Sequence, residues 1–254
     1  MKRLFIPFLL VFYFASPLLT AKESDKLTGP LKDIQQKIEQ TFESARKTKD
    51  MTKMKDIINM LGEREKQKKS WINNYWQAFA YYHMSLLHLE RGQKDEAKSF
   101  NEKAIEILEK IENPNSETYA LMAQSVSYSI TFINSALAAS TSAKARQYVQ
   151  KALKMNNKNL RAYYIQGRSD FYTPKQYGGG KVAEKSFLKA LSLKETYSDK
   201  PNMPTWGKKQ VYVFLVMFYQ REGRTNDALL YCKKGLKKYP KYYALKKLEG
   251  SLKK

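Results

Sequence analysis

The stretch Gly223–Pro240, "GRTNDALLYCKKGLKKYP", carries the pattern that decides the fold. It opens with a turn glycine and closes with a proline, so one helix fits between these two residues. Two small residues, Ala228 and Gly235, stand seven positions apart and therefore lie on the same face of that helix. Small side chains on one face allow a neighbouring helix to approach closely. We therefore expect this helix to pack against another in a hairpin.

The same spacing recurs three times earlier in the chain, in units that begin at Gly92, Ala143 and Gly180. The pairs of small residues are Ala97/Ala104, Ala145/Ala152 and Ala183/Ala190. In three of the four units, the position four residues after the first small residue is Val149, Phe187 or Cys232. A pattern that recurs in this way predicts stacked helical repeats.

This pattern resembles the tetratricopeptide repeat (TPR) family, whose small residues lie where the two helices of a hairpin touch. In that family a proline often closes the unit, as Pro240 does here. The resemblance covers roughly residues 71–251. It implies an all-α, TPR-type solenoid of about four helical hairpins, with a C-terminal capping helix over 241–251. The first helices of the units agree less well, and the segment Ser129–Ala136 in the second unit fits poorly.

Apolar residues recur at spacings of three and four over 31–45, 75–89, 97–111 and 119–137, which is typical of amphipathic helices. We interpret Val211–Phe218, "VYVFLVMF", as a buried helix because its flanks continue in helical register. The chain is expected to have three parts. These are a targeting segment over 1–21, a degenerate N-terminal helix pair over 22–70, and the solenoid with its capping helix over 71–254.

The first 21 residues have the layout of a secretory signal peptide. Lys2 and Arg3 precede the apolar run Leu4–Phe14, and the small residue Ala21 ends the segment. The run is short for a membrane span. An uncleaved N-terminal anchor is the alternative, because the bulky Leu19 stands two places before Ala21, the last residue before the expected cut. We therefore predict an exported protein, periplasmic or at the cell surface.

The chain is strongly basic, with 46 Lys+Arg against 24 Asp+Glu and a formal net charge of +22. This excess favours acidic partners, such as nucleic acid, anionic lipid or acidic proteins. Export argues against nucleic acid. Lysines concentrate near the C-terminus and form a candidate surface for an anionic membrane, with an ordinary solvated helix face as the alternative. These candidates are Lys233, Lys234, Lys237, Lys238, Lys246 and Lys247.

Three consecutive glycines lie in Thr173–Lys181, "TPKQYGGGK". A phosphate-binding loop, G-x-x-x-x-G-K-[ST], would need glycine at 175 and a hydroxyl residue at 182, where the chain has lysine and valine. We interpret the segment as a lengthened turn between two helices. A lip beside a binding groove is the functional alternative to a tolerated insertion. The residues of this turn are Pro174, Gly178, Gly179 and Gly180.

We expect no catalytic, metal or cofactor site. The two histidines, His83 and His88, stand five apart on one helix, so their side chains point in different directions. The single cysteine, Cys232, cannot form an intramolecular disulfide and is expected in the core. The chain contains none of the common catalytic motifs.

The resemblance implies a concave groove lined by the first helices of the repeats, where ligands of this family bind. Candidate groove contacts are Tyr75, Tyr82, Tyr163, Tyr164, Arg168, Tyr172 and Tyr177. Packing in the core is the alternative for the aromatic residues. We predict a non-catalytic adaptor that binds a protein or peptide in this groove. The alternative is an accessory ligand-binding component of a solute transporter, closing on a small molecule near residues 173–181. Partner identity and oligomeric state stay open.

Overall fold

A computed structural model of the chain describes residues 31–252, apart from 196, 198, 199 and 201. The expected signal peptide therefore lies outside the described residues. Within them the chain forms α-helices and two short 3-10 turns, with no strand, so the all-α prediction is confirmed. The helices are α2 (Ile34–Thr48), α3 (Thr52–Gln67), α4 (Trp71–Glu90), α5 (Lys94–Glu109), α6 (Ser116–Ser129), α7 (Ser135–Met155), α8 (Leu160–Tyr172), α9 (Ala183–Ser192), α10 (Lys208–Arg221), α11 (Thr225–Lys238) and α12 (Tyr243–Leu252).

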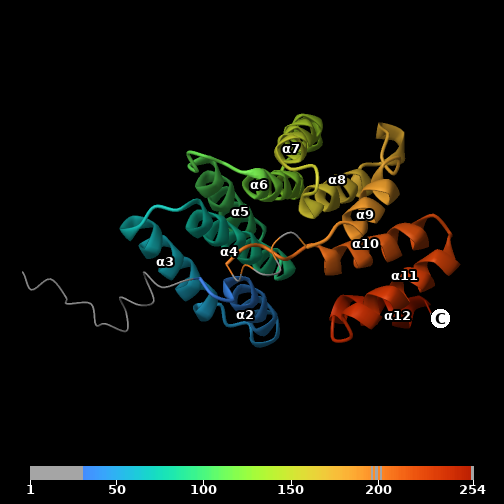
Figure 1. The fold of residues 1–254 in the computed structure, drawn as a ribbon, viewed down its shortest axis with the longest axis horizontal. Helices are drawn as coiled ribbons and strands as arrows, with labels where there is room; N and C mark the ends of the chain where they lie inside the picture. Colours follow the sequence, from blue (N-terminus) through green and yellow to red (C-terminus); the bar gives the residue numbers. More distant parts are fainter. Residues whose placement is uncertain (1–30, 196, 198–199, 201, 253–254) are drawn as a thin grey trace, which may run out of the picture.

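Four helical hairpins follow one another along an arc, α4–α5, α6–α7, α8–α9 and α10–α11 (Figure 1). The helix α12 packs against α11 and α10 at the C-terminal end, where the capping helix was expected. At the other end α3 packs on α4, and α2 contacts both α3 and α4. In the part of the chain that the structure describes, no helix has both the length and the apolar character that crossing a membrane requires.

The small residues of the repeat pattern are all buried, as the helix contacts require. The seven alanines are at most 1% exposed, and Gly235 is also buried. Cys232 is buried among them. In the first repeat the position equivalent to Cys232 is Asn101, which is buried and donates a hydrogen bond to the Ser125 carbonyl of the next repeat (3.0 Å). The register read from the sequence is therefore confirmed.

The second repeat differs from the prediction. One helix was expected over 119–137, but α6 ends at Ser129 and α7 begins at Ser135. The Asn134 side chain accepts a hydrogen bond from the Leu137 backbone N–H (3.2 Å), which caps the start of α7. The cap therefore determines where α7 begins, although apolar residues continue at helical spacing across this position. The first helix of this repeat is therefore α6, rather than the segment at the α6–α7 junction.

Gly167 lies where α8 packs against α9, the two helices of the third repeat. A substitution at this position therefore tests the contact between these helices. A Cβ atom at this position would lie 2.6 Å from the Phe187 ring, which is fully buried. We expect Gly167→Ala to destabilise the protein by about 1–3 kcal/mol, because the ring has no free space into which it can shift. The control is Gly250→Ala in α12, where nothing lies within 4 Å, and this change is expected to be neutral or slightly stabilising. Urea denaturation of both variants measures the difference, and equal stabilities would contradict the prediction.

Candidate functional site: a groove on the concave side

A groove of about 1180 Å³ lies on the concave side of the arc. Residues of α2, α4, α6 and α8 line it, together with Trp206, the start of α10, the α11–α12 turn and the start of α12. The second helices of the four hairpins, α5, α7, α9 and α11, contribute no residue and lie on the outer side of the arc (Figure 1). The groove is therefore built by the first helices of the repeats and by both ends of the described chain.

Arg168 joins three repeats across the wall of the groove. Its guanidinium donates to the Tyr82 hydroxyl on α4 (3.3 Å) and to the Gln124 carbonyl on α6 (3.3 Å). It also lies 5.8 Å from the centre of the Tyr164 ring. Burial raises the pKa of Tyr164 to about 12, even though the charge of Arg168 acts to lower it, so this hydroxyl stays protonated at neutral pH. These neutral partners leave the positive charge of Arg168 uncompensated.

The lining of the groove has a surplus of positive charge, six Lys or Arg against three Glu. All three glutamates are paired. Glu39 contacts Lys209 (2.5 Å), while Arg46 contacts Glu90 (2.8 Å) and Glu43 (3.6 Å). Four cations have no carboxylate within ion-pair distance among the described residues. They are Lys47, Arg168, Lys241 and Lys247.

His83 forms part of an aromatic wall of the groove and carries no charge at neutral pH. Its Nδ1 lies 2.8 Å from the Phe79 carbonyl, and its ring packs against Phe42 and Phe79. Burial lowers the pKa of this imidazole. His88 instead stacks on Phe100 of α5, at 4.8 Å between ring centres. The two histidines thus contact different helices, and no cluster of three metal-ligating side chains occurs within the described residues.

The connection between α9 and α10 crosses the concave side before α10 begins. Trp76 Nε1 donates to the Asn202 carbonyl (2.8 Å). The Gln35 side-chain oxygen accepts hydrogen bonds from the backbone N–H groups of Thr205 (2.7 Å) and Trp206 (3.1 Å). The Trp206 side chain is only 3% exposed. This connection therefore covers part of the concave face and forms one wall of the groove.

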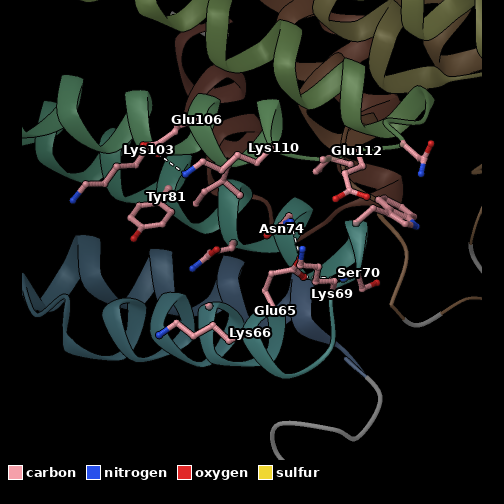
Figure 2. A pocket seen from close by; sticks show the side chains of 16 residues that line it. Glu65, Lys66, Lys69, Ser70, Asn74, Tyr81, Lys103, Glu106, Lys110 and Glu112 are labelled. Atoms are coloured by element: carbon pink, nitrogen blue, oxygen red, sulfur yellow. Dashed lines mark hydrogen bonds and ion pairs between the residues drawn. The ribbon is translucent and has the colours of Figure 1, made fainter.

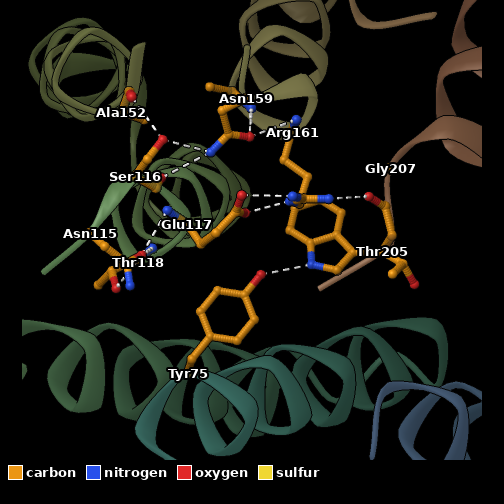
Figure 3. Close-up of polar contacts among 12 residues, drawn as sticks. Tyr75, Asn115, Ser116, Glu117, Thr118, Ala152, Asn159, Arg161, Thr205 and Gly207 are labelled. Atoms are coloured by element: carbon orange, nitrogen blue, oxygen red, sulfur yellow. Dashed lines mark hydrogen bonds and ion pairs between the residues drawn. The ribbon is translucent and has the colours of Figure 1, made fainter. Parts of the chain in front are cut away.

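A buried polar network holds Trp206 in place (Figure 3). Trp206 Nε1 donates to the Tyr75 hydroxyl (2.8 Å), and Arg161 Nη1 donates to the Trp206 carbonyl (3.2 Å). Arg161 forms a bidentate ion pair with Glu117, with Nη2 2.6 Å from Oε1 and Nε bonded to Oε2. The two side chains are 0% and 1% exposed. The network therefore links α4, α6 and α8 to the connection.

Two asparagine caps explain why Glu117 and Arg161 meet. Asn115 Oδ1 accepts from the Glu117 N–H (2.9 Å) at the start of α6, and Asn159 Oδ1 accepts from the Arg161 N–H (2.9 Å) at the start of α8. Each charged residue is therefore the second residue of a first helix in consecutive repeats. The Asn159 amide also donates to the Ser116 hydroxyl (2.8 Å), which ties the two starts together.

The structure brings three of the predicted groove contacts together, namely Tyr82, Tyr164 and Arg168. Tyr75 is 0% exposed and cannot contact a ligand, so the prediction for this residue was wrong. Its place in the groove is taken by the Trp206 side chain, which packs over it. Tyr163 is part-buried against the core and lines no part of the groove, which corrects the prediction for it.

Tyr172 and Tyr177 are 64% and 75% exposed near the glycine turn, and neither lines the groove, so their assignment as groove contacts is corrected as well. The turn lies at the far end of α8 from the network. Gly178 and Gly180 have positive φ angles of 86° and 81°, as a lengthened turn requires. Gly179 packs tightly, because a Cβ atom there would lie 1.8 Å from the Thr173 carbonyl oxygen.

Asp170 occupies the position that a phosphate would need after this turn. Its Oδ2 accepts hydrogen bonds from the Val182 N–H (2.9 Å) and the Ala183 N–H (2.8 Å) at the start of α9. A carboxylate already satisfies these donors and would repel a second anion. The turn around Pro174 is tied to the residue that follows α10 by an ion pair between Lys175 and Glu222 (2.8 Å). It therefore serves as an ordered connection between helices.

The C-terminal lysines do not form one surface. Lys247 lines the groove, together with Lys241. Lys233, Lys234 and Lys237 are exposed on α11, on the outer side of the arc. Lys238 and Lys246 are also exposed. Lys238 lies 3.6 Å from Glu195, and Lys246 is on α12. The sequence run thus supplies two separate basic regions.

A second hollow, of about 900 Å³, lies between α3, the start of α4 and the end of α5 (Figure 2). Four lysines and three glutamates line it, so its charge is nearly balanced. Lys110 pairs with Glu106 (2.6 Å), and Glu65 accepts hydrogen bonds from the Ser70 N–H and the Asn74 side chain. Internal contacts thus use much of its polar surface, and the concave groove is the better candidate for a binding site.

Sequence reasoning missed the groove residues of α2, which include Phe42, Arg46 and Lys47, and those that face them, Lys209 and Tyr242. Their spacing indicates amphipathic helices and nothing more. The basic surplus of the chain was the one sequence feature that pointed to a basic binding surface. Nothing local in the sequence indicates that α2 lies across the concave side from α12.

Residues 80–110, which cover the second half of α4 and all of α5, match the family model of the tetratricopeptide repeat. A thermophilic TPR protein of Thermus thermophilus, TTC0263, has a similar structure, with a TM-score of 0.57 and 15% sequence identity over 85% of this chain and 98% of that chain. Together with the four stacked hairpins, these findings support a TPR-type helical solenoid, as the sequence pattern predicted.

A second solved structure, of YrrB, described as a TPR protein with an unusual peptide-binding site, aligns with a TM-score of 0.39 and 15% identity. The alignment covers 83% of this chain and 97% of that chain. No curated protein sequence matches the chain significantly.

Proposed function

We propose that this protein is an exported, non-catalytic adaptor that binds an extended segment of another protein in the concave groove. The observation that carries the proposal is the groove itself, where Tyr82, Tyr164 and the uncompensated Arg168 share one lining with three further unpaired cations. The unpaired cations favour acidic residues in such a segment, and Tyr243, which is 66% exposed in the same lining, offers it an aromatic surface. The tyrosines Tyr82 and Tyr164 and Arg168 come from first helices of the repeats, while the other three unpaired cations come from α2, the α11–α12 turn and α12.

Export rests on the sequence of the first 21 residues, where a basic start precedes a short apolar run and a small residue. The alternative function, a transporter accessory that closes on a small solute, would need an enclosed apolar pocket. Nine charged side chains line this groove, so we do not propose that function.

Photo-crosslinking tests the proposal directly. A photoreactive amino acid replaces Tyr243, which is 66% exposed at the groove, and the chain is mixed with a cell-envelope extract at high salt. We expect one or a few discrete crosslinked proteins. Arg168→Gln should reduce their yield about tenfold, because hydrogen bonds to a charged group contribute about 1.5–3 kcal/mol.

The control places the same photoreactive residue at Gln147, which is exposed on α7 on the outer side of the arc. This position should give no discrete product. Equal products from both positions, or a yield that Arg168→Gln leaves unchanged, would show that the groove is not the binding site.

A further inference from the structure

The outer side of the arc changes its charge along the solenoid. On α5, in the first repeat, three lysines stand against five acidic residues. The second helices of the next three repeats carry ten lysines and arginines, four on α7, two on α9 and four on α11, and all ten are exposed. These helices contain two acidic residues, Glu184 and Asp227. We call the ten exposed cations the outer basic face.

The two acidic residues do not neutralise this face. Both accept hydrogen bonds from Arg224, at 2.8 Å each, and Glu184 also accepts one from the Tyr219 hydroxyl (2.9 Å). Among the ten cations, Lys144 pairs with Glu109 (3.5 Å) and Lys238 with a glutamate beyond α9 (3.6 Å). In the part of the chain that the structure describes, the other eight have no carboxylate within ion-pair distance.

Helix geometry turns these lysines toward solvent. On α11 the buried residues Ala228 and Cys232 define the inner face, and Lys233 and Lys237 lie on the opposite face. Leu230 lies on that same outward face and is 45% exposed. On α7 two further apolar side chains, Leu137 and Met155, are 52% and 56% exposed. Large apolar side chains thus lie exposed among the lysines.

We propose that the outer basic face docks on an anionic membrane surface. Lysines near a membrane are attracted to anionic headgroups, and exposed apolar side chains enter the boundary between headgroups and acyl chains. A nucleic acid would engage the same lysines but would gain nothing from Leu230 or Met155. The groove lies on the opposite side of the arc, so docking leaves it open to a protein partner. The proposal stands on its own surface and does not require the proposed groove function.

Vesicle flotation of the full chain tests this inference, with phosphatidylcholine vesicles that contain or lack phosphatidylglycerol. The outer variant carries Lys233→Gln, Lys234→Gln and Lys237→Gln. The control variant carries Lys53→Gln, Lys55→Gln and Lys68→Gln at exposed positions on or next to α3, so both lose three charges and both keep residues 1–21. Circular dichroism confirms that each variant is folded.

The parent chain should bind the anionic vesicles more tightly than the neutral ones, since residues 1–21 are the same in every variant and contribute to both. The outer variant should bind about 100-fold more weakly, which corresponds to about 1 kcal/mol for each lysine. The control variant should stay within about threefold of the parent. Equal losses in the two variants, or equal binding of the parent to neutral vesicles, would overturn the proposal.

Leu230→Ser separates a membrane from a nucleic acid. We expect it to weaken binding to anionic vesicles severalfold and to leave the weak, salt-dependent binding of an oligonucleotide unchanged. If Leu230→Ser left vesicle binding unchanged while the outer variant lost oligonucleotide binding, the face would be a nucleic-acid surface and the membrane proposal would be wrong.

Discussion

Replacing Arg161 by methionine is expected to destabilise the protein by about 3–5 kcal/mol, which is a large loss for a single substitution. The change leaves the Glu117 carboxylate, which is 1% exposed, without a partner inside the solenoid. It also removes the hydrogen bond to the Trp206 carbonyl. An uncompensated buried charge is costly because neither water nor another donor can replace the guanidinium.

Chemical denaturation of the full chain measures this loss, and hydrogen exchange of the α9–α10 connection shows whether the connection is released. The double variant Arg161→Met with Glu117→Leu is the matched control. It removes both charges and leaves apolar groups, so it should recover most of the lost stability. A single variant that costs less than about 1 kcal/mol, or a double variant no better than the single one, would contradict the account of the network.

Trp206→Ala is expected to destabilise the protein by about 3–5 kcal/mol, because it empties the space between α4 and α8. The Trp206 ring lies 5.7 Å from the Phe79 ring and 6.3 Å from the Tyr164 ring, between ring centres. Its indole N–H satisfies the Tyr75 hydroxyl, which is fully buried. Burial also raises the pKa of Tyr75, so this hydroxyl remains neutral and accepts the hydrogen bond.

Two controls separate packing from hydrogen bonding in this prediction. Trp206→Phe keeps a ring in the space and loses only the N–H donor, so it should cost about 1–3 kcal/mol. Trp71→Ala removes a part-buried indole at the start of α4 and should cost clearly less than Trp206→Ala. Thermal denaturation compares the three variants. If Trp206→Ala and Trp71→Ala proved equally stable, the connection would not be a structural part of the concave side.

Much of the fold was predictable because its signals are local. Pairs of small residues seven apart, such as Ala145 and Ala152, placed one face of each second helix in the core, and all of these residues are buried. The break between α6 and α7 was predictable in principle as well, since Asn134 is a good helix cap. The prediction missed this break because apolar residues continue at helical spacing past Asn134.

The candidate site was predictable only in part. Arg168, Tyr82 and Tyr164 follow from the repeat register, because first helices face the concave side. Lys47 and Lys241 do not follow from it, since they lie on α2 and in the α11–α12 turn, about 190 residues apart in sequence and on opposite sides of one groove. Chain segments so far apart meet only because the solenoid curves.

Tyr75 and Tyr82 mark the boundary between what the sequence determined and what the tertiary structure decided. They stand seven residues apart on α4, so the sequence placed both on one helical face turned toward the concave side. They differ because Trp206, 131 residues beyond Tyr75, covers Tyr75 completely, whereas Tyr82, which is 5% exposed, still reaches the lining of the groove. Helical periodicity and small-residue spacing act between near neighbours and can be read from the chain itself. Which part of a face a distant connection covers depends on where the folded arc brings that connection, and only the tertiary structure decides it.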